Sequence, residues 1–218
     1  MTRYGMVIDL GRCLGCGACA FACKAENGTG PGVWYTKVYL REAGKFPNAR
    51  RIAFPTLCMH CQNPPCVDVC PTGASQKSAD GIVSVNADLC IGCKYCEAAC
   101  PYDARTFVES IKGYFPKYGL NAYEKLMYAK HQSGVVEKCN FCPTRIAQGK
   151  EPACVATCPS YARIFGDLDD PNSEVSKILA ARKAYTLLPE LGTKPSVYYV
   201  TGNYPDTLAE IMASAAKT

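Results

Sequence analysis

The chain has 218 residues, of which 48% are hydrophobic, and a formal net charge of +5. This length and composition place it among globular proteins of one or two domains with a buried core. The basic residues are dispersed and no stretch reaches the ~18 apolar residues of a membrane helix, which argues against a nucleic-acid-binding patch and against a membrane span.

The N-terminal half is predicted to contain short elements. Strands are expected at 4–10 and 33–41, and a short helix at 18–26 that ends at Asn27-Gly28. Residues 74–85 indicate a β-hairpin, because two alternating segments flank a turn that contains glycine.

Residues 103–135 form a predicted insertion that is rich in tyrosine and charged residues. Its middle, 121–130, is expected to be a helix. Two interpretations of the insertion stay open, a surface excursion that packs on its own domain and a docking arm for a partner subunit.

The C-terminal part is predicted to return to the sheet at 162–165. An amphipathic helix is expected from Asp170, its N-cap, to Tyr185. Residues 197–200 and 208–212 are predicted to belong to a tail that packs on another surface.

The sixteen cysteines fall into four groups of four with none left over. Groups one and three have the C-x2-C-x2-C-x3-C spacing that wraps a [4Fe–4S] cluster, and groups two and four lengthen the gap between their second and third cysteines. All groups except the first end in Cys-Pro; Lys24 follows Cys23 instead. The groups are Cys13, Cys16, Cys19, Cys23; Cys58, Cys61, Cys66, Cys70; Cys90, Cys93, Cys96, Cys100; and Cys139, Cys142, Cys154, Cys158.

Disulfides and zinc are the rival explanations for so many cysteines. A disulfide scaffold is usually short and preceded by a signal peptide, and neither feature is present. Zinc sites pair two C-x2-C knuckles a dozen or more residues apart, whereas Cys90, Cys93 and Cys96 lie within seven residues. The spacing therefore favours iron–sulfur clusters.

The hairpin at 74–85 joins groups two and three as in a two-cluster ferredoxin, in which the last cysteine of each group ligates the other cluster. Gly15, Gly17 and Gly92 are expected to adopt positive φ, so that N–H groups point at the sulfurs. Four oxidised clusters of about −2 each would change the net charge from +5 to about −3, so much of the positive charge is expected to balance them. The predicted ligand sets are set I, Cys13, Cys16, Cys19 and Cys158; set II, Cys23, Cys139, Cys142 and Cys154; set III, Cys58, Cys61, Cys66 and Cys100; and set IV, Cys70, Cys90, Cys93 and Cys96.

No catalytic residues are indicated. The sequence contains no nucleophile motif, no phosphate-binding glycine loop and no paired carboxylates away from the cysteines. His60 either tunes a cluster by a hydrogen bond to sulfur or faces solvent, and His131 is expected at the surface.

The motifs resemble the four-cluster iron–sulfur (beta) subunit of the dimethyl sulfoxide reductase family of molybdopterin oxidoreductases, which includes polysulfide, thiosulfate, tetrathionate, arsenate and selenate reductases. The resemblance covers roughly residues 4–200 and is specific to the subunit type, not to the substrate. It rests on MVIDLGRCLGCGAC at 6–19, PTLCMHC at 55–61, CVATCP at 154–159 and IFGDLDDP at 164–171.

The resemblance implies a non-catalytic electron-transfer subunit with four [4Fe–4S] clusters. Its implied partners are a molybdenum or tungsten bis-pterin catalytic subunit and, in many complexes, a membrane anchor that oxidises quinol. The first residues contain no apolar run of signal-peptide length. Because such members are commonly exported folded with a twin-arginine partner, we expect the periplasmic side of the membrane, with the cytoplasm as the alternative.

The predicted fold class is α+β, with two ferredoxin-like two-cluster modules, an insertion and a C-terminal helical tail. Residues 1–50 and 136–200 form the first module, 51–102 the second, 103–135 the insertion and 201–218 the tail. A free-standing polyferredoxin or a hydrogenase- or formate-linked electron carrier is the competing hypothesis, and a non-redox iron–sulfur scaffold is a weaker one. The long spacer between groups three and four favours permanent docking surfaces.

Overall fold

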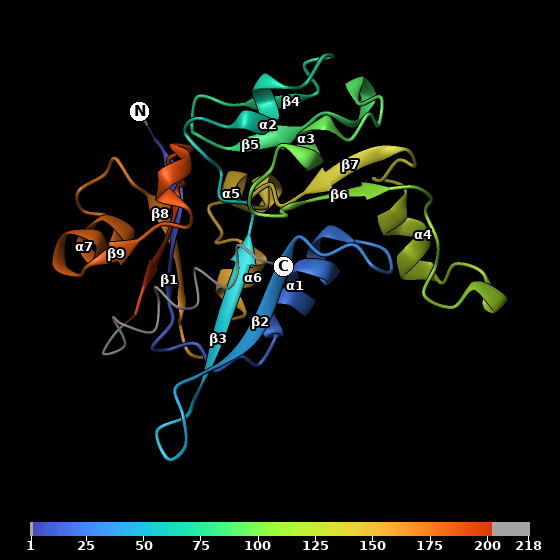
Figure 1. Cartoon of the computed structure of the whole chain (residues 1–218). Coiled ribbons are helices and arrows are strands. Elements are labelled where there is room, and N and C mark those ends of the chain that lie inside the picture. The colour runs from blue at the N-terminus through green and yellow to red at the C-terminus, as the bar shows by residue number, and fades with distance from the viewer. Residues whose placement is uncertain (1, 202–218) are drawn as a thin grey trace.

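The computed structural model describes residues 2–201 (Figure 1). The predicted segment 208–212, and the tail 201–218 apart from Thr201, lie outside the described residues. The helices are α1 (Ala18–Asn27), α2 (Pro65–Asp68), α3 (Tyr95–Ala98), α4 (Ala122–Tyr128), α5 (Pro143–Ala147), α6 (Ala153–Ala156) and α7 (Glu174–Ala181). The strands are β1 (Tyr4–Asp9), β2 (Thr36–Ala43), β3 (Arg50–Leu57), β4 (Ser75–Lys77), β5 (Val83–Val85), β6 (Arg105–Val108), β7 (Val135–Lys138), β8 (Arg163–Asp167), β9 (Ala184–Tyr185) and β10 (Val197–Val200).

A four-stranded sheet in the order β8-β1-β10-β9 supports one half of the molecule. β1 pairs antiparallel with β8 and parallel with β10. Both faces of β1 are covered: Val7 packs with Val175 of α7, whereas Met6 and Ile8 belong to the core that contains Cys19 and Cys23. Side chains alternate across a strand, so β1 separates α7 from the cysteine loops (Figure 1).

The other half is built from α2, the β4–β5 hairpin, α3 and the β6–β7 ribbon, at the top and right of Figure 1. Its small core joins Cys66, Val83, Cys96 and Val136. The strands and hairpin predicted at 4–10, 33–41 and 74–85, and the helix ending at Asn27-Gly28, are confirmed with small shifts in their bounds.

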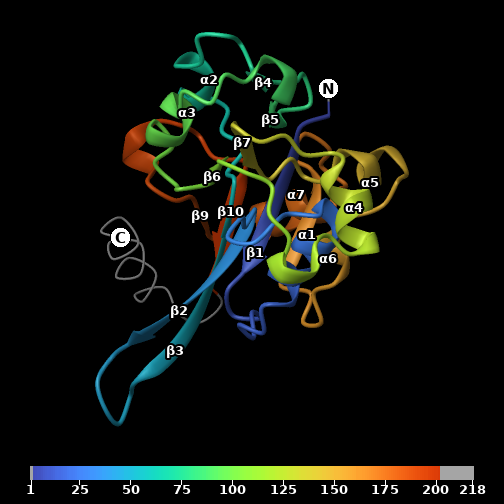
Figure 2. The same ribbon diagram turned by 90° about the vertical axis from the view of Figure 1, so that its right-hand side faces the viewer.

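β2 and β3 form a long antiparallel arm that projects from the body (Figures 1 and 2). The arm is attached to the sheet at its root. There the Phe54 ring stacks on Tyr199 with 4.8 Å between the ring centroids, and the Tyr199 hydroxyl donates to the Pro55 carbonyl over 3.0 Å. Leu57, the last residue of β3, leads directly into the second cysteine group.

The predicted insertion packs on the first half of the chain. The Tyr123 hydroxyl donates to the Ala25 carbonyl over 2.6 Å, and the Tyr114 hydroxyl to the Thr29 carbonyl over 3.1 Å. α4, which confirms the helix predicted at 121–130, starts with a capping box between Asn121 and Glu124. These contacts fit the first interpretation of the segment, although its outer face leaves aromatic side chains exposed.

The predicted boundary of the second module at residue 102 lies just before β6. β6 lies within the range assigned to the insertion, yet Arg105 of this strand donates to Cys66 of the second module. β6 follows Cys100 as β8 follows Cys158.

The C-terminal prediction is wrong in three respects, the N-cap of the helix, its end, and the nature of residues 197–200. Ser173, not Asp170, is the N-cap of α7; Asp170 instead closes a turn by accepting from the Asn172 N–H over 2.9 Å. The helix ends at Ala181, and Tyr185 lies in β9. Residues 197–200 are a buried strand of the central sheet and not a tail, because β10 pairs with both β1 and β9.

Candidate metal centres

All four cysteine groups use the same backbone conformation. The residue before the second cysteine has a positive φ in each group: Gly15 at 68°, His60 at 44°, Gly92 at 68° and Phe141 at 59°. A left-handed residue between two thiols turns successive N–H groups to one side, which makes an anion-binding concavity. His60 and Phe141 hold it despite a Cβ, at a cost of ~1–2 kcal/mol each. The positive φ predicted at the glycines is confirmed, with Gly17 at 75°.

The first half of the molecule contains sets I and II. In set I, burial raises the pKa of Cys13, and the nearby thiols of Cys19 and Cys158 raise it further; Cys16 lies on the same loop and is exposed. In set II, burial is the main cause of the raised pKa of Cys23. The thiols of Cys139, Cys154 and Cys142 add to this rise, and all four residues are buried.

The second half contains sets III and IV. In set III, burial and the thiols of Cys58, Cys66 and Cys100 raise the pKa of Cys61 to about 12, although a hydrogen bond from Thr193 opposes the rise. In set IV, Cys70, Cys90, Cys93 and Cys96 line one small cavity together with apolar side chains such as Val85 and Val136. These contacts link all four members of sets II, III and IV, and in set I they link Cys13, Cys19 and Cys158. The assignment of ligands to clusters stays a prediction.

The sets follow one another in a row. Cys154 of set II lies near Cys19 of set I, and Cys139 of set II near Cys58 of set III. Cys66 of set III and Cys96 of set IV share one small core. Sets II and III are buried apart from a half-buried Cys100, whereas each end set contains one exposed cysteine, Cys16 or Cys93.

Two of the three cysteines that precede a proline and cross to a neighbouring set, Cys70 and Cys158, receive matching hydrogen bonds. The Ser75 N–H donates to Cys70 Sγ over 3.4 Å, and the Ala162 N–H donates to Cys158 Sγ over 3.3 Å. Burial alone would raise the pKa of both thiols. These donors and neighbouring N–H and hydroxyl groups outweigh the effect of burial, so the pKa of each thiol lies below its ordinary value. Both cysteines are thereby prepared to bind metal as thiolates.

The first group ends differently because α1 continues past Cys23. Lys24, which replaces the proline of the other groups, donates from Nζ to the Gly30 and Val33 carbonyls over 2.8 Å each. Its pKa is lowered by burial to about 8. The lysine thus fixes the loop that follows the helix, whereas the proline of the other groups ends a short helix.

The residues present fit [4Fe–4S] clusters. None of the sixteen thiols is in a disulfide, and among the described residues no three His, Cys, Asp or Glu side chains lie close enough to bind a single metal ion. The buried side chains Arg105, Lys138 and Arg163 lie beside these thiols and belong to none of the ion pairs found in residues 2–201. Unpaired buried cations require an anionic partner, which a thiolate-bound cluster supplies.

Neither histidine is at the surface. His60 is 0% exposed, so the solvent-facing alternative is wrong; its ring stacks on Phe141, and its Nδ1 accepts from the Val83 N–H over 3.1 Å. Its Nε2 is buried without a hydrogen-bond partner in the described residues, which leaves a donor free for a group at the site. His131 is partly buried, with Nδ1 2.5 Å from Glu137 Oε1 and Nε2 2.8 Å from the Asn27 carbonyl, which corrects its expected surface position.

The sequence matches two known families. Residues 49–115 and 121–168 match a 4Fe-4S dicluster domain, and residues 4–25 match a 4Fe-4S binding domain. In the part of the chain that the structure describes, no helix is long and apolar enough to cross a membrane.

Named relatives align over most of the chain. A polysulfide reductase chain of Wolinella succinogenes is 42% identical, covering 91% of this chain and 94% of its own length. The arsenate respiratory reductase iron–sulfur subunit of a Shewanella species is 40% identical, and the alignment covers 91% of this chain and 96% of the relative. A sulfite dehydrogenase subunit of Allochromatium vinosum is 42% identical, and the alignment covers 92% of this chain and 83% of the relative.

Proposed function

Since the protein belongs to the iron–sulfur electron-transfer subunits of the dimethyl sulfoxide reductase family, we propose that it connects an electron donor to a molybdenum or tungsten bis-pterin catalytic subunit. The chain carries four [4Fe–4S] clusters and has no catalytic role of its own. A quinol-oxidising membrane subunit is the donor we propose.

The single observation that carries this proposal is the row of four cysteine sets. When bound, each [4Fe–4S] cluster accepts and returns one electron. The protein's part is to hold the four sets in sequence, to exclude water from sets II and III, and to leave sets I and IV near the surface. A row that is buried in the middle and exposed at both ends suits transfer from one partner to another.

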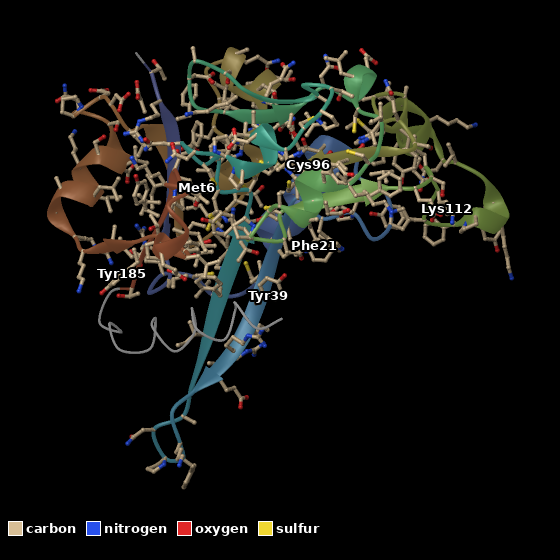
Figure 3. The ribbon with its side chains drawn as sticks, turned by 45° about the horizontal axis from the view of Figure 1, so that its top comes forward. Met6, Phe21, Tyr39, Cys96, Lys112 and Tyr185 are labelled. Carbon is tan, nitrogen blue, oxygen red and sulfur yellow. The ribbon has the colours of Figure 1, made fainter. Side chains whose placement is uncertain are left out.

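The surroundings of the two end sets support docking there. Leu14 is 72% and Phe21 66% exposed beside set I, and Ile91 is 67% and Tyr95 64% exposed beside set IV. Figure 3 labels Phe21 on α1, which contains Cys19 of set I, and Cys96 of set IV on α3. We propose that one partner covers each of these apolar rims, because a dry contact brings an external redox centre close to the cluster.

We also propose that the exposed aromatic face of the insertion, which includes Phe115 and Tyr118, adds to a partner contact. The proposed location is the periplasmic side of the membrane, reached by export with a twin-arginine partner, and the cytoplasm is the alternative. Cell fractionation of the tagged complex separates these locations.

The test removes one ligand at each end of the row. Cys16→Ala and Cys93→Ala should each degrade or convert one cluster, so that turnover with quinol slows, while the molybdenum or tungsten content is retained. Turnover with a dye that reduces the catalytic subunit directly should stay normal and is the control. If quinol-linked turnover were unchanged in either variant, that set would not be on the path.

Metal analysis of the anaerobically purified native complex separates the alternatives. The proposal requires about sixteen iron atoms from this chain plus those of the partner, with about one molybdenum or tungsten. Iron without either metal would favour a free polyferredoxin.

A further inference from the structure

Three buried cations lie along the row of cysteine sets. Arg105 is 2%, Arg163 3% and Lys138 5% exposed, and no other lysine or arginine side chain that the structure describes is buried. The ion pairs among residues 2–201 involve other side chains, so none of the three has a carboxylate partner. Buried charges without such a partner are costly, and their positions therefore call for an explanation.

Arg105 adjoins sets III and IV. Its Nη2 donates to Cys66 Sγ of set III over 3.0 Å, and its Nη1 donates to Ser75 Oγ over 2.7 Å. Burial lowers the pKa of the guanidinium, but the thiols of Cys66, of Cys96 in set IV and of Cys58 outweigh this effect and raise it. The same charge therefore acts on both sets of the second module.

Arg163 occupies the equivalent position in the first module. It lies five residues after Cys158, as Arg105 lies five residues after Cys100. Its Nη2 donates to Thr36 Oγ1 over 2.9 Å. Burial raises the pKa of Cys154 in set II, and Arg163 opposes this rise by its charge and by a hydrogen bond; its charge also acts on Cys13 of set I.

Lys138 lies where the two modules meet. Its Nζ donates to the Cys139 carbonyl of set II over 2.5 Å and to the carbonyl of Val83 in the second module. Its charge opposes the burial-induced rise in the pKa of both Cys139 and Cys66. The lysine therefore adjoins sets II and III.

We propose that each of the three intervals between successive clusters contains one fixed positive charge, Arg163, Lys138 and Arg105 in that order, which raises the reduction potential of the two clusters beside it. The proposal rests on the ligand sets of the proposed function. An added electron makes each cluster more negative, so an adjacent buried cation favours the reduced form. Because each cation is shared, it stabilises an added electron on either of the two neighbouring clusters.

The experiment is a redox titration of the anaerobically purified complex, followed by electron paramagnetic resonance. In Arg105→Gln we expect the clusters of sets III and IV to become harder to reduce. Their equilibrium constants for reduction should fall at least tenfold, which corresponds to ~59 mV for one electron. In Lys138→Gln we expect the same for sets II and III. Lys177→Gln, which removes an exposed charge on α7, is the matched control and should change every cluster less than twofold.

Arg105→Lys and Lys138→Arg keep the charge and should therefore show little of the fall in reduction potential that the glutamine variants show. The proposal would be overturned if the reduction potentials shifted as far in these variants as in the glutamine variants. It would also be overturned if the glutamine variants shifted all four clusters equally or shifted none of them. If Arg105→Gln lost iron, a normal iron content in Arg105→Lys would support the need for a positive charge at this position. Loss of iron from both variants would refute that need. Iron content and the number of cluster signals in the unaltered complex test the ligand sets separately from the cations.

Discussion

Gly92, in the third cysteine group, offers a sharp test of how the loop geometry holds a cluster. It has a φ of +68°, and a Cβ on it would lie 2.2 Å from the Gly134 carbonyl oxygen and 2.9 Å from a ring carbon of Phe107. Gly134 has a φ of +79° and open space around its Cβ position. The two glycines therefore separate the cost of the backbone conformation from the cost of lost space.

The magnitudes follow from this difference. Alanine at either position costs ~1–2 kcal/mol for the left-handed conformation. Gly92→Ala must in addition displace the Gly134 backbone, whose N–H donates to the Val108 carbonyl over 2.7 Å. Overpacking of this kind costs about 2 kcal/mol more, which weakens the folded loop of set IV by about thirtyfold.

The assay is iron content together with the rate of cluster loss to a chelator, measured anaerobically on the purified complex. Gly92→Ala should lose the cluster of set IV and retain about twelve iron atoms in the chain, whereas Gly134→Ala should retain about sixteen. Equal behaviour of the two variants would show that the close contact with Gly134 does not matter. Loss of other clusters in Gly92→Ala would show that the four sites are not locally independent.

Three further predictions concern stability, measured by anaerobic denaturation followed by cluster absorbance. Tyr199→Phe removes the buried hydroxyl at the root of the β2–β3 arm and should lower the free energy of unfolding by about 1–2 kcal/mol; an unchanged midpoint would contradict this. His131→Gln should cost about 1–2 kcal/mol at pH 6, because the hydrogen bond with Glu137 raises the pKa of His131 above 6.5. That contribution is complete below pH 6.5 and disappears as the pH rises through the folded-state pKa, so a penalty that grew with pH would be the wrong sign. Ser173→Ala should cost ~1 kcal/mol as the loss of a helix N-cap, and a larger loss from Asp170→Ala would refute the assignment of the cap.

The cluster sites could be predicted because cluster ligation imposes short, fixed cysteine spacings on the chain. The sequence also contains a signal for two of the buried cations. Cys-Pro-Tyr-Asp-Ala-Arg105 and Cys-Pro-Ser-Tyr-Ala-Arg163 repeat the same arrangement at the ends of groups three and four. Lys138 has no such repeat, and its side chain contacts a residue far away in the sequence, donating to the Val83 carbonyl.

The C-terminal strand could not be predicted because its neighbour lies at the other end of the chain. Residues 197–200 form a short apolar segment that fits a surface tail as well as a strand. Only its pairing with β1, which starts at Tyr4, decides the matter. The N-cap of α7 was missed for a local reason, since Asp170 and Ser173 both have side chains suited to a cap and the structure uses the first for a turn.

The pairing of β1 with β10 has a consequence for synthesis on the ribosome. In the predicted ligand assignment, sets III and IV lie between Cys58 and Cys100 and can be complete while the rest of the chain is still being made. Cys13 to Cys23 must wait for Cys139 to Cys158 and for β10, which at ~5–20 residues per second is a delay on the order of 10 s. During that interval four thiols lack their predicted partners, so a shortage of iron or a pulse of oxygen should damage the sites of sets I and II before those of sets III and IV.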